Sequence, residues 1–265
     1  MKRYILGRIL LMAPTLLGAG ILIFFLMRVI PGDICLARWV DYGSDLDPTL
    51  LELCRSDLGL NAPLYIQFAR FFEGIMTLDF GVSLWTGQPI IDELNQRFAL
   101  SLQVAIMATL VSVMIAVPLG IVSAIHQNTW IDYLVRTISI AGVAMPSFWL
   151  GILIILGLLI FSQAWFGDPW MPPIEYVSPF EDFQSNMSQL IWPVIATGYR
   201  YSAVVARMTR SAFLEVLHED YIRMGRAKGL TERLVINRHA MRNALLPVVT
   251  IISMEFSFFI GGLVV

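Results

Sequence analysis

Apolar runs long enough to cross a lipid bilayer recur along this chain, and they constrain its fold more than any other feature. Each run can form one transmembrane helix, because about 20 predominantly apolar residues span roughly 30 Å of hydrocarbon. Charged residues make up 14% of the 265 residues, whereas soluble domains carry about 25%. The sequence therefore predicts an all-α, polytopic membrane helix bundle. Its five expected spans are about Ile9–Ile30, Leu100–Ile125, Leu134–Phe161, Leu190–Met208 and Leu245–Val265.

The basic residues are distributed unevenly between the predicted loops, and this distribution sets the orientation. Lys2, Arg3 and Arg8 lie before the first span, and the stretch 207–242 holds eight Lys and Arg residues against four acidic ones. The segment 31–98 holds four Arg residues against ten acidic ones, and 163–189 holds four acidic residues and no basic one. We therefore expect a cytoplasmic N-terminus, a cytoplasmic loop at about 211–244 and two external loops.

This pattern divides the chain into three segments. Residues 1–30 form an N-terminal transmembrane anchor, because the first apolar run is too long for a signal-peptide core and no small-x-small cleavage site follows it. Residues 31–98 form an extracytoplasmic segment, either a packed lid over the spans or a dock for an external partner. Residues 99–265 form the membrane core that contains the cytoplasmic loop. Since no polar flank closes the last apolar run, we expect the chain to be a fragment of a longer protein.

Cys35 and Cys54 both lie in the expected external segment. An oxidising outer compartment permits a disulfide between them. Sequence spacing does not show whether their Cα atoms approach closely enough. A disulfide and two unpaired thiols are therefore both compatible with the sequence.

Motifs for catalysis and for cofactor binding are absent from the sequence. A phosphate-binding loop needs Gly-Lys followed by Ser or Thr, and neither Lys2 nor Lys228 follows a Gly. The three histidines, His126, His218 and His239, lack metal-ligand spacing. We therefore expect no catalytic residue, no metal site, no cofactor and no nucleic-acid partner for this chain.

The cytoplasmic loop has the pattern of two helices joined by a tight turn. Lys228 falls in a last helical turn, and Gly229 suits the left-handed position that follows it. Thr231 can cap a second helix, with Glu232 in its first turn. An apolar stripe at helical spacing precedes the turn: Leu214, Leu217, Tyr221 and Met224. The compact turn favours docking into a protein groove, and an amphipathic helix lying on anionic lipid is the alternative.

Several stretches in a fixed order carry a family resemblance. They are Pro31-Gly32-Asp33, Leu58-Gly59-Leu60, Phe80-Gly81 through Thr86-Gly87, Pro146-Ser147-Phe148-Trp149-Leu150-Gly151, and the loop from Asp220 to Leu230 with Arg238-His239-Ala240 and Arg242 to Pro247 after it. With these motifs the chain resembles the ABC transporter permeases of the dipeptide/oligopeptide/nickel family over essentially its whole length. The last stretch is similar to the family's EAA loop, although Arg223 and Met224 replace the Glu and Ala of the general motif.

The resemblance implies a permease of the type I ABC importer kind, with a sixth span after the present C-terminus. It implies a multi-pass protein of a bacterial or archaeal cytoplasmic (inner) membrane that imports peptides or a related small solute. The implied partners are a second permease subunit, two ATPases that bind ATP and Mg²⁺, and an extracytoplasmic solute-binding protein. The loop residues that would contact the ATPases are Asp220, Arg223, Arg226, Ala227, Lys228, Gly229 and Leu230.

Polar residues inside the predicted spans are candidates for lining a transport pathway. These are Glu255, Arg200 and Ser147. Glu255 lies about 15 Å along the last span from Leu245, near the middle of the membrane. Two other interpretations are open: Glu255 is a structural partner of Arg200, and Arg207 extends to the cytoplasmic interface.

Two other functional classes are weaker. A self-sufficient secondary transporter or channel would show inverted repeats and paired broken helices, and we find neither in the sequence. A membrane enzyme would need a catalytic constellation, which is missing. The sequence does not choose between dipeptide, oligopeptide and nickel as substrate, or between a homodimeric and a heterodimeric permease.

Overall fold

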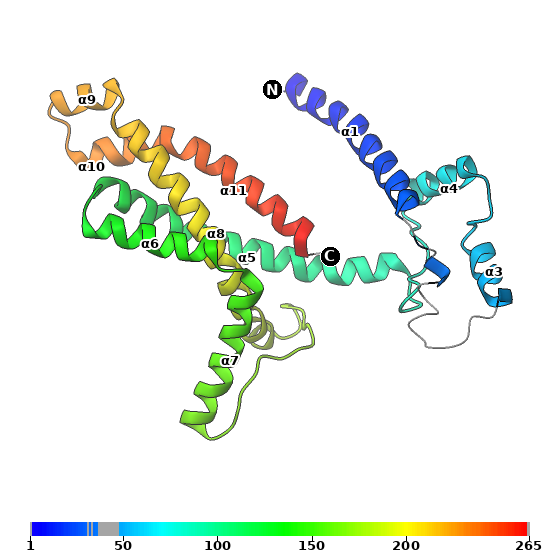
Figure 1. The fold of residues 1–265 in the computed structure, drawn as a ribbon. Helices are drawn as coiled ribbons and strands as arrows, with labels where there is room; N and C mark the ends of the chain where they lie inside the picture. Colours follow the sequence, from blue (N-terminus) through cyan, green and yellow to red (C-terminus); the bar gives the residue numbers. More distant parts are fainter. Residues whose placement is uncertain (1, 31, 33, 37–47, 264–265) are drawn as a thin grey trace. The chain divides into compact units, whose positions relative to one another are not determined.

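The computed structural model describes the chain apart from residues 1, 31, 33, 37–47 and 264–265, and the regular structure of the described residues is helical (Figure 1). The described residues also contain an isolated antiparallel β-bridge between Val82 and Pro89. Two compact units make up the chain, Met1–Asn95 and Gln96–Val265, and their boundary lies within α5 (Ile90–Ile125). The predicted all-α class is confirmed. Pro31 and Asp33, which belong to the first motif of the resemblance, lie outside the described residues.

The first unit contains α1 (Lys2–Val29), α3 (Pro48–Asp57) and α4 (Leu64–Thr77). The side chain of Phe24 in α1 is 1% exposed. Its ring centroid lies 5.2 Å from that of Phe68 and 5.6 Å from that of Phe71, both in α4. Helical spacing of aromatic residues therefore gives α4 the face that packs on the end of α1.

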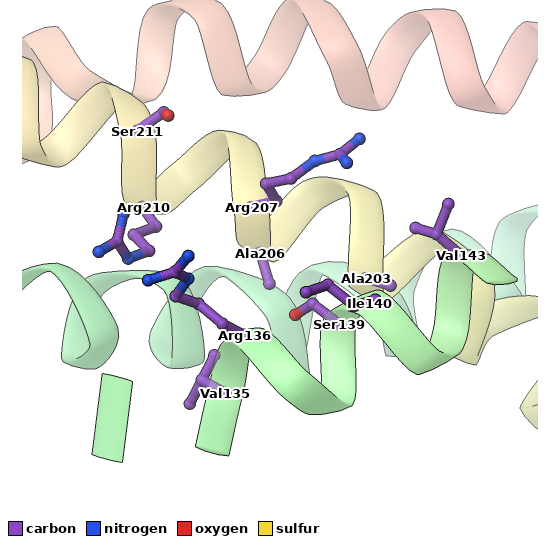
Figure 2. Close-up of a pocket in the computed structure, with 10 residues that line it drawn as sticks. All are labelled: Val135, Arg136, Ser139, Ile140, Val143, Ala203, Ala206, Arg207, Arg210 and Ser211. Atoms are coloured by element: carbon purple, nitrogen blue, oxygen red, sulfur yellow. The ribbon is translucent and has the colours of Figure 1, made fainter. Parts of the chain in front are cut away.

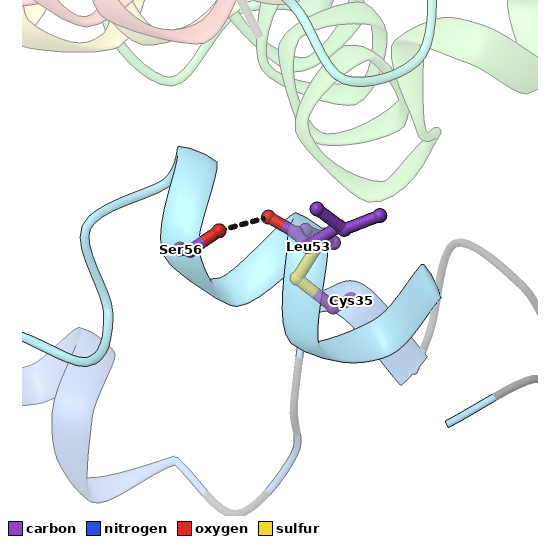
Figure 3. Close-up of a disulfide and its surroundings, with 4 residues drawn as sticks. Cys35, Leu53 and Ser56 are labelled. Carbon is purple, nitrogen blue, oxygen red and sulfur yellow. Dashed lines mark hydrogen bonds between the residues drawn. A yellow bond between two sulfur atoms is a disulfide. The ribbon is translucent and has the colours of Figure 1, made fainter. Parts of the chain in front are cut away.

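A disulfide joins Cys35 to Cys54 of α3, with the two Cα atoms 6.0 Å apart (Figure 3). Cys35 is fully buried. Beside the disulfide, Ser56 Oγ donates a hydrogen bond of 2.8 Å to the Leu53 carbonyl oxygen. The bridge closes a loop with a sequence separation of 19 residues, which stabilises the folded unit by about 3 kcal/mol through the lost entropy of the unfolded chain.

The second unit is built around a long helix, α8. Its elements after α5 are α6 (Trp130–Ala144), α7 (Ser147–Phe166), α8 (Phe183–Leu217), α9 (Asp220–Ala227), α10 (Glu232–Leu234), the π-helix η1 (Val235–Ala240) and α11 (Met241–Leu263). Helix α8 contacts α6, α7 and α11. Small residues let these helices approach closely. A Cβ added to Gly120 of α5 would lie 2.6 Å from Thr209 Cβ, and one added to Gly142 of α6 would lie 2.9 Å from Ala203 Cβ.

Four of the described helices are long and apolar enough to cross a membrane: Arg3–Val29, Ile90–Ile125, Ser147–Phe166 and Glu232–Gly262. The predicted fourth span, 190–208, lies inside α8, which is not among these four. The charges of Arg200 and Arg207 lower its mean hydropathy. Helix α8 nevertheless packs against α6, α7 and α11. A helix inside a bundle can carry such charges, because they can face other helices rather than lipid.

The prediction of one continuous span over 134–161 is wrong. Helix α6 ends at Ala144, and α7 begins at Ser147. Met145 has an extended backbone, with φ −87° and ψ 126°. A proline disfavours the helical conformation in the residue before it, and Pro146 follows Met145 here. The proline therefore separates two helices rather than bending one.

Candidate functional site

The loop between α8 and α11 forms a compact helical turn at one end of the second unit (Figure 1). Helix α9 ends at Ala227, and Gly229 adopts φ +80°, the left-handed conformation that the sequence predicts. The amide of Gly229 donates to the Arg226 carbonyl at 2.9 Å, and the amide of Leu230 donates to the Gly225 carbonyl at 3.3 Å. This pair of hydrogen bonds is a Schellman motif, which satisfies the last carbonyls of α9 and reverses the chain.

An ion pair and a hydrogen bond fix the two sides of this turn. Arg226 Nη2 lies 2.6 Å from Glu232 Oε1, and Arg226 Nε donates to Glu232 Oε2 at 3.1 Å. Asn243 Nδ2 donates to the Tyr221 hydroxyl at 2.9 Å, which connects α9 to α11. Bidentate pairing defines the relative orientation of the two groups as well as their distance. The turn is therefore held at both of its helices.

Helix α9 is anchored to the core by one side chain. Ile222 is 1% exposed and packs in a cluster that includes Phe213 of α8, Val235 of η1 and Ala244 of α11. Leu230 packs against the same cluster. A displacement of α9 must therefore move α8 and α11 with it, because a closely packed core transmits strain.

Two details of the loop differ from the sequence prediction. The stripe from Leu214 to Met224 assumes one helix, but α8 ends at Leu217 and α9 starts at Asp220, so Met224 is left 54% exposed. The break rotates the helix, and Ile222 becomes the buried residue. Thr231 occupies the N-cap position of α10, and its carbonyl accepts the first backbone hydrogen bonds, from the amides at 234 and 235. Its side chain, however, makes no capping hydrogen bond.

The remaining predicted loop residues present an exposed, mainly basic surface. Arg223, Ala227 and Lys228 are all exposed. Asp220 Oδ1 lies 3.6 Å from Arg223 Nη1, and both side chains are largely in solvent, so this pair contributes little to stability. These four residues are available to a partner, while Gly229 and Leu230 shape the turn beneath them.

The three polar residues predicted inside the spans come together at one cavity. Ser147 of α7, Arg200 of α8 and Glu255 of α11 all line a cavity of about 480 Å³, with aromatic side chains from Tyr201 and Phe258. No ion pair shorter than 4.0 Å joins Arg200 to Glu255 in the described chain. Arg200 and Glu255 therefore line the same cavity without a direct ion pair, and the alternative of Glu255 as a structural partner of Arg200 stays a prediction.

Sequence reasoning missed one buried site, around Asp132 at the start of α6. Its carboxylate is fully buried and accepts from Arg210 Nε at 2.7 Å and from Arg210 Nη2 at 2.8 Å. It also accepts from Ser123 Oγ at 2.6 Å and from the Asn128 amide at 3.0 Å. The hydrogen bonds from Arg210 hold the pKa of Asp132 far below its ordinary value, although burial opposes this shift.

The Asp132 site connects α5, α6 and α8 next to the cytoplasmic loop. Arg210 lies two turns before the end of α8 at Leu217, and it is 78 residues from Asp132 in the chain. A carboxylate near the start of a predicted span was the available signal, because a charge there needs a partner. No sequence pattern near Asp132 identified Arg210 as that partner.

Comparisons with known proteins support one family across the chain. Residues 116–265 match the family described as binding-protein-dependent transport system inner membrane component, and residues 1–105 match its N-terminal membrane component. The glutathione transport system permease protein GsiC of Escherichia coli (strain K12) is 36% identical over all 265 residues, which cover 81% of that protein. Its counterpart in Salmonella typhimurium (strain LT2) is 35% identical over the same coverage.

Proposed function

The chain belongs to the family of binding-protein-dependent transport system inner membrane components, and we propose that it forms half of a peptide pathway whose opening is driven through the α9–α10 turn. As a family member it is a transmembrane subunit of a peptide-type importer, an inner-membrane protein and not an enzyme.

The observation that carries the proposal is the rigid turn at Gly229 with its exposed tip. The Schellman motif and the Arg226–Glu232 pair hold the turn, and Ile222 fixes it to the core. A cytoplasmic ATPase that binds Arg223 and Ala227 would displace the α9–α10 turn as one rigid element. This displacement would therefore move α8 and α11 as well.

The same two helices carry the charged residues of the cavity lined by Ser147, Arg200 and Glu255, here called the polar cavity. Movement of the helices would therefore change this cavity. Arg200 lies on α8 and Glu255 on α11. When α8 and α11 move, the separation and access of the two charges change. A peptide offers a cationic amine and an anionic carboxylate, which complement Glu255 and Arg200. Opening and closing this cavity would alternate the access of such a solute.

The partners and cofactors follow from this scheme. A second permease subunit would complete the pathway, and two ATPase subunits would bind ATP and Mg²⁺, which this chain has no loop to hold. A solute-binding protein would deliver the peptide from outside. The N-terminus would lie in the cytoplasm, on the same side as the α9–α10 turn, in agreement with the basic residues of 207–242.

The first test is affinity purification of the tagged protein in mild detergent, followed by mass spectrometry of the proteins that copurify. We expect a second permease and a P-loop ATPase. Recovery of a stable homo-oligomer without any nucleotide-binding partner would support the alternative, a self-sufficient secondary transporter or channel.

A site-specific test addresses the docking surface. Ala227→Cys should form a cross-link to the ATPase, because Ala227 is exposed at the end of α9. Ser178→Cys is the matched control, since it lies in the predicted external loop 163–189. Equal cross-linking of the two variants would contradict the proposed docking surface.

A further inference from the structure

A second cavity lies between α6 and α8, and its volume is about 380 Å³. None of its lining residues lines the cavity that contains Arg200 and Glu255. Its basic residues are Arg136 of α6 and Arg207 and Arg210 of α8 (Figure 2). Ser139 and Ser211 add two hydroxyl groups. Figure 2 shows Arg136 directed toward Arg210 at one end of the cavity, while Arg207 extends away from these two side chains. This end can hydrogen-bond an anion from several sides.

The wall of the cavity has more positive than negative charge. Arg210 uses Nε and Nη2 for Asp132, so its Nη1 edge is left for another acceptor. No acidic side chain lies within 4.0 Å of Arg136 or Arg207 in the part of the chain that the structure describes. The guanidinium carbon of Arg136 lies 5.9 Å from the ring centroid of Tyr133 instead. With one carboxylate against three guanidinium groups, the local net charge is +2.

The other end of the cavity is apolar. It is lined by Ile140 and Val143 of α6 and by Ala203 of α8, and Figure 2 shows Val143 at the opposite end from Arg210. Ile140 is 64% exposed and Val143 is 41% exposed. The helix rises about 10 Å from Arg136 to Val143. In the orientation expected from the basic residues, Arg136 is nearer the cytoplasm than Val143, which would place Val143 deeper in the bilayer.

We propose that this cavity binds one anionic phospholipid of the cytoplasmic leaflet. The phosphate contacts Arg136 and the free edge of Arg210, and Arg207 adds positive charge. An acyl chain extends along Ile140 and Val143. Basic pockets between membrane helices on the cytoplasmic side suit such head groups, and guanidinium groups match phosphate oxygens. A free phosphate would leave the exposed apolar end unoccupied.

The lipid would act on the element that the proposed function uses. Arg207 and Arg210 are part of α8, which the Asp132 site ties to α5 and α6. A phosphate bridging α6 to α8 at this level would hold the two helices together beside the α9–α10 turn. This inference needs only the membrane insertion of the chain, so it stands or falls independently of the docking of an ATPase.

The test is native mass spectrometry of the purified transporter in detergent, titrated with phosphatidylglycerol. We expect one tightly bound lipid, with affinity about fivefold lower for Arg136→Gln and about 30-fold lower for the double variant Arg136→Gln with Arg207→Gln. The control is Arg3→Gln with Arg233→Gln, which removes two exposed charges elsewhere on the same expected side of the membrane. Arg136→Lys with Arg207→Lys keeps the charge, and we expect it to retain most of the binding.

Three results would overturn the proposal. The first is an equal loss of phosphatidylglycerol binding in the test and control double variants, which would indicate general charge attraction. The second is equal affinity for phosphatidylcholine, which would remove the role of the net charge. The third is displacement of the lipid by glycerol 1-phosphate at equal concentration, which would assign the cavity to a soluble phosphate. If both double variants fail to assemble, the comparison of Arg136→Gln with Arg3→Gln gives the same decision.

Discussion

Replacing Gly229 tests the link between the turn and transport most directly. Gly229 has φ +80°, and a Cβ built on it would meet no atom within 4 Å. Substitution therefore introduces backbone strain without a steric clash. A left-handed conformation costs an ordinary residue roughly 1–2 kcal/mol, and a β-branched residue is a genuine outlier there. For Gly229→Val we take about 2 kcal/mol, which lowers the population of the native turn about 30-fold relative to competing turns.

The measured quantities are ATP hydrolysis and peptide uptake, both with the assembled transporter in proteoliposomes. When the turn changes, the hydrogen bonds from the amides of Gly229 and Leu230 are lost. The ATPase then pushes on an element that yields. We expect Gly229→Val to retain ATP hydrolysis while uptake per ATP falls by at least tenfold. Gly229→Asn should have a smaller effect, because Asn tolerates the left-handed conformation.

Gly167 provides the matched control. It caps α7 with φ +82°, and a Cβ there would also meet no atom within 4 Å. Gly167→Val thus introduces the same strain at a site outside the cytoplasmic loop, and we expect normal coupling. Wild-type uptake per ATP in Gly229→Val, or an equal loss in Gly167→Val, would refute the reasoning.

Three further predictions concern the buried carboxylate, the polar cavity and the disulfide. Asp132→Ala should lower the free energy of unfolding by about 3 kcal/mol in chemical denaturation, because Arg210 loses its partner and is only partly exposed. Since the pKa of Asp132 is lower in the folded than in the unfolded protein, this stabilisation is complete above the unfolded pKa and is lost as the pH falls. A wild-type protein that is equally stable at pH 3 and pH 7 would argue against this role of Asp132. Glu255→Gln should reduce peptide uptake at least tenfold while ATP hydrolysis continues, and unchanged uptake would remove Glu255 from the pathway. Cys35→Ser should destabilise the first unit by about 3 kcal/mol, measured by protease resistance with and without reductant; if Cys54→Ser behaved differently from Cys35→Ser, the loss would not come from the disulfide.

Local chemistry determined much of this protein from the sequence. Apolar length defines the membrane helices, because hydrocarbon must be matched by about 20 apolar residues. The left-handed turn at Gly229 could be predicted from the local sequence, because glycine adopts positive φ angles more readily than other residues. The aromatic face of α4 follows from helical spacing in the same way. The cytoplasmic orientation of the N-terminus stays a prediction from the distribution of basic residues.

Only the tertiary structure decided which distant residues meet. Ser147, Arg200 and Glu255 come from three different helices to one cavity. Asp132 finds Arg210 across 78 residues. Such pairings depend on how the helices cross, and crossing is set by the packing of small residues along α5, α6 and α8 rather than by any local pattern. At Pro146 the sequence allows either a bend or a break, and only the structure shows that α6 ends at Ala144 and α7 begins at Ser147.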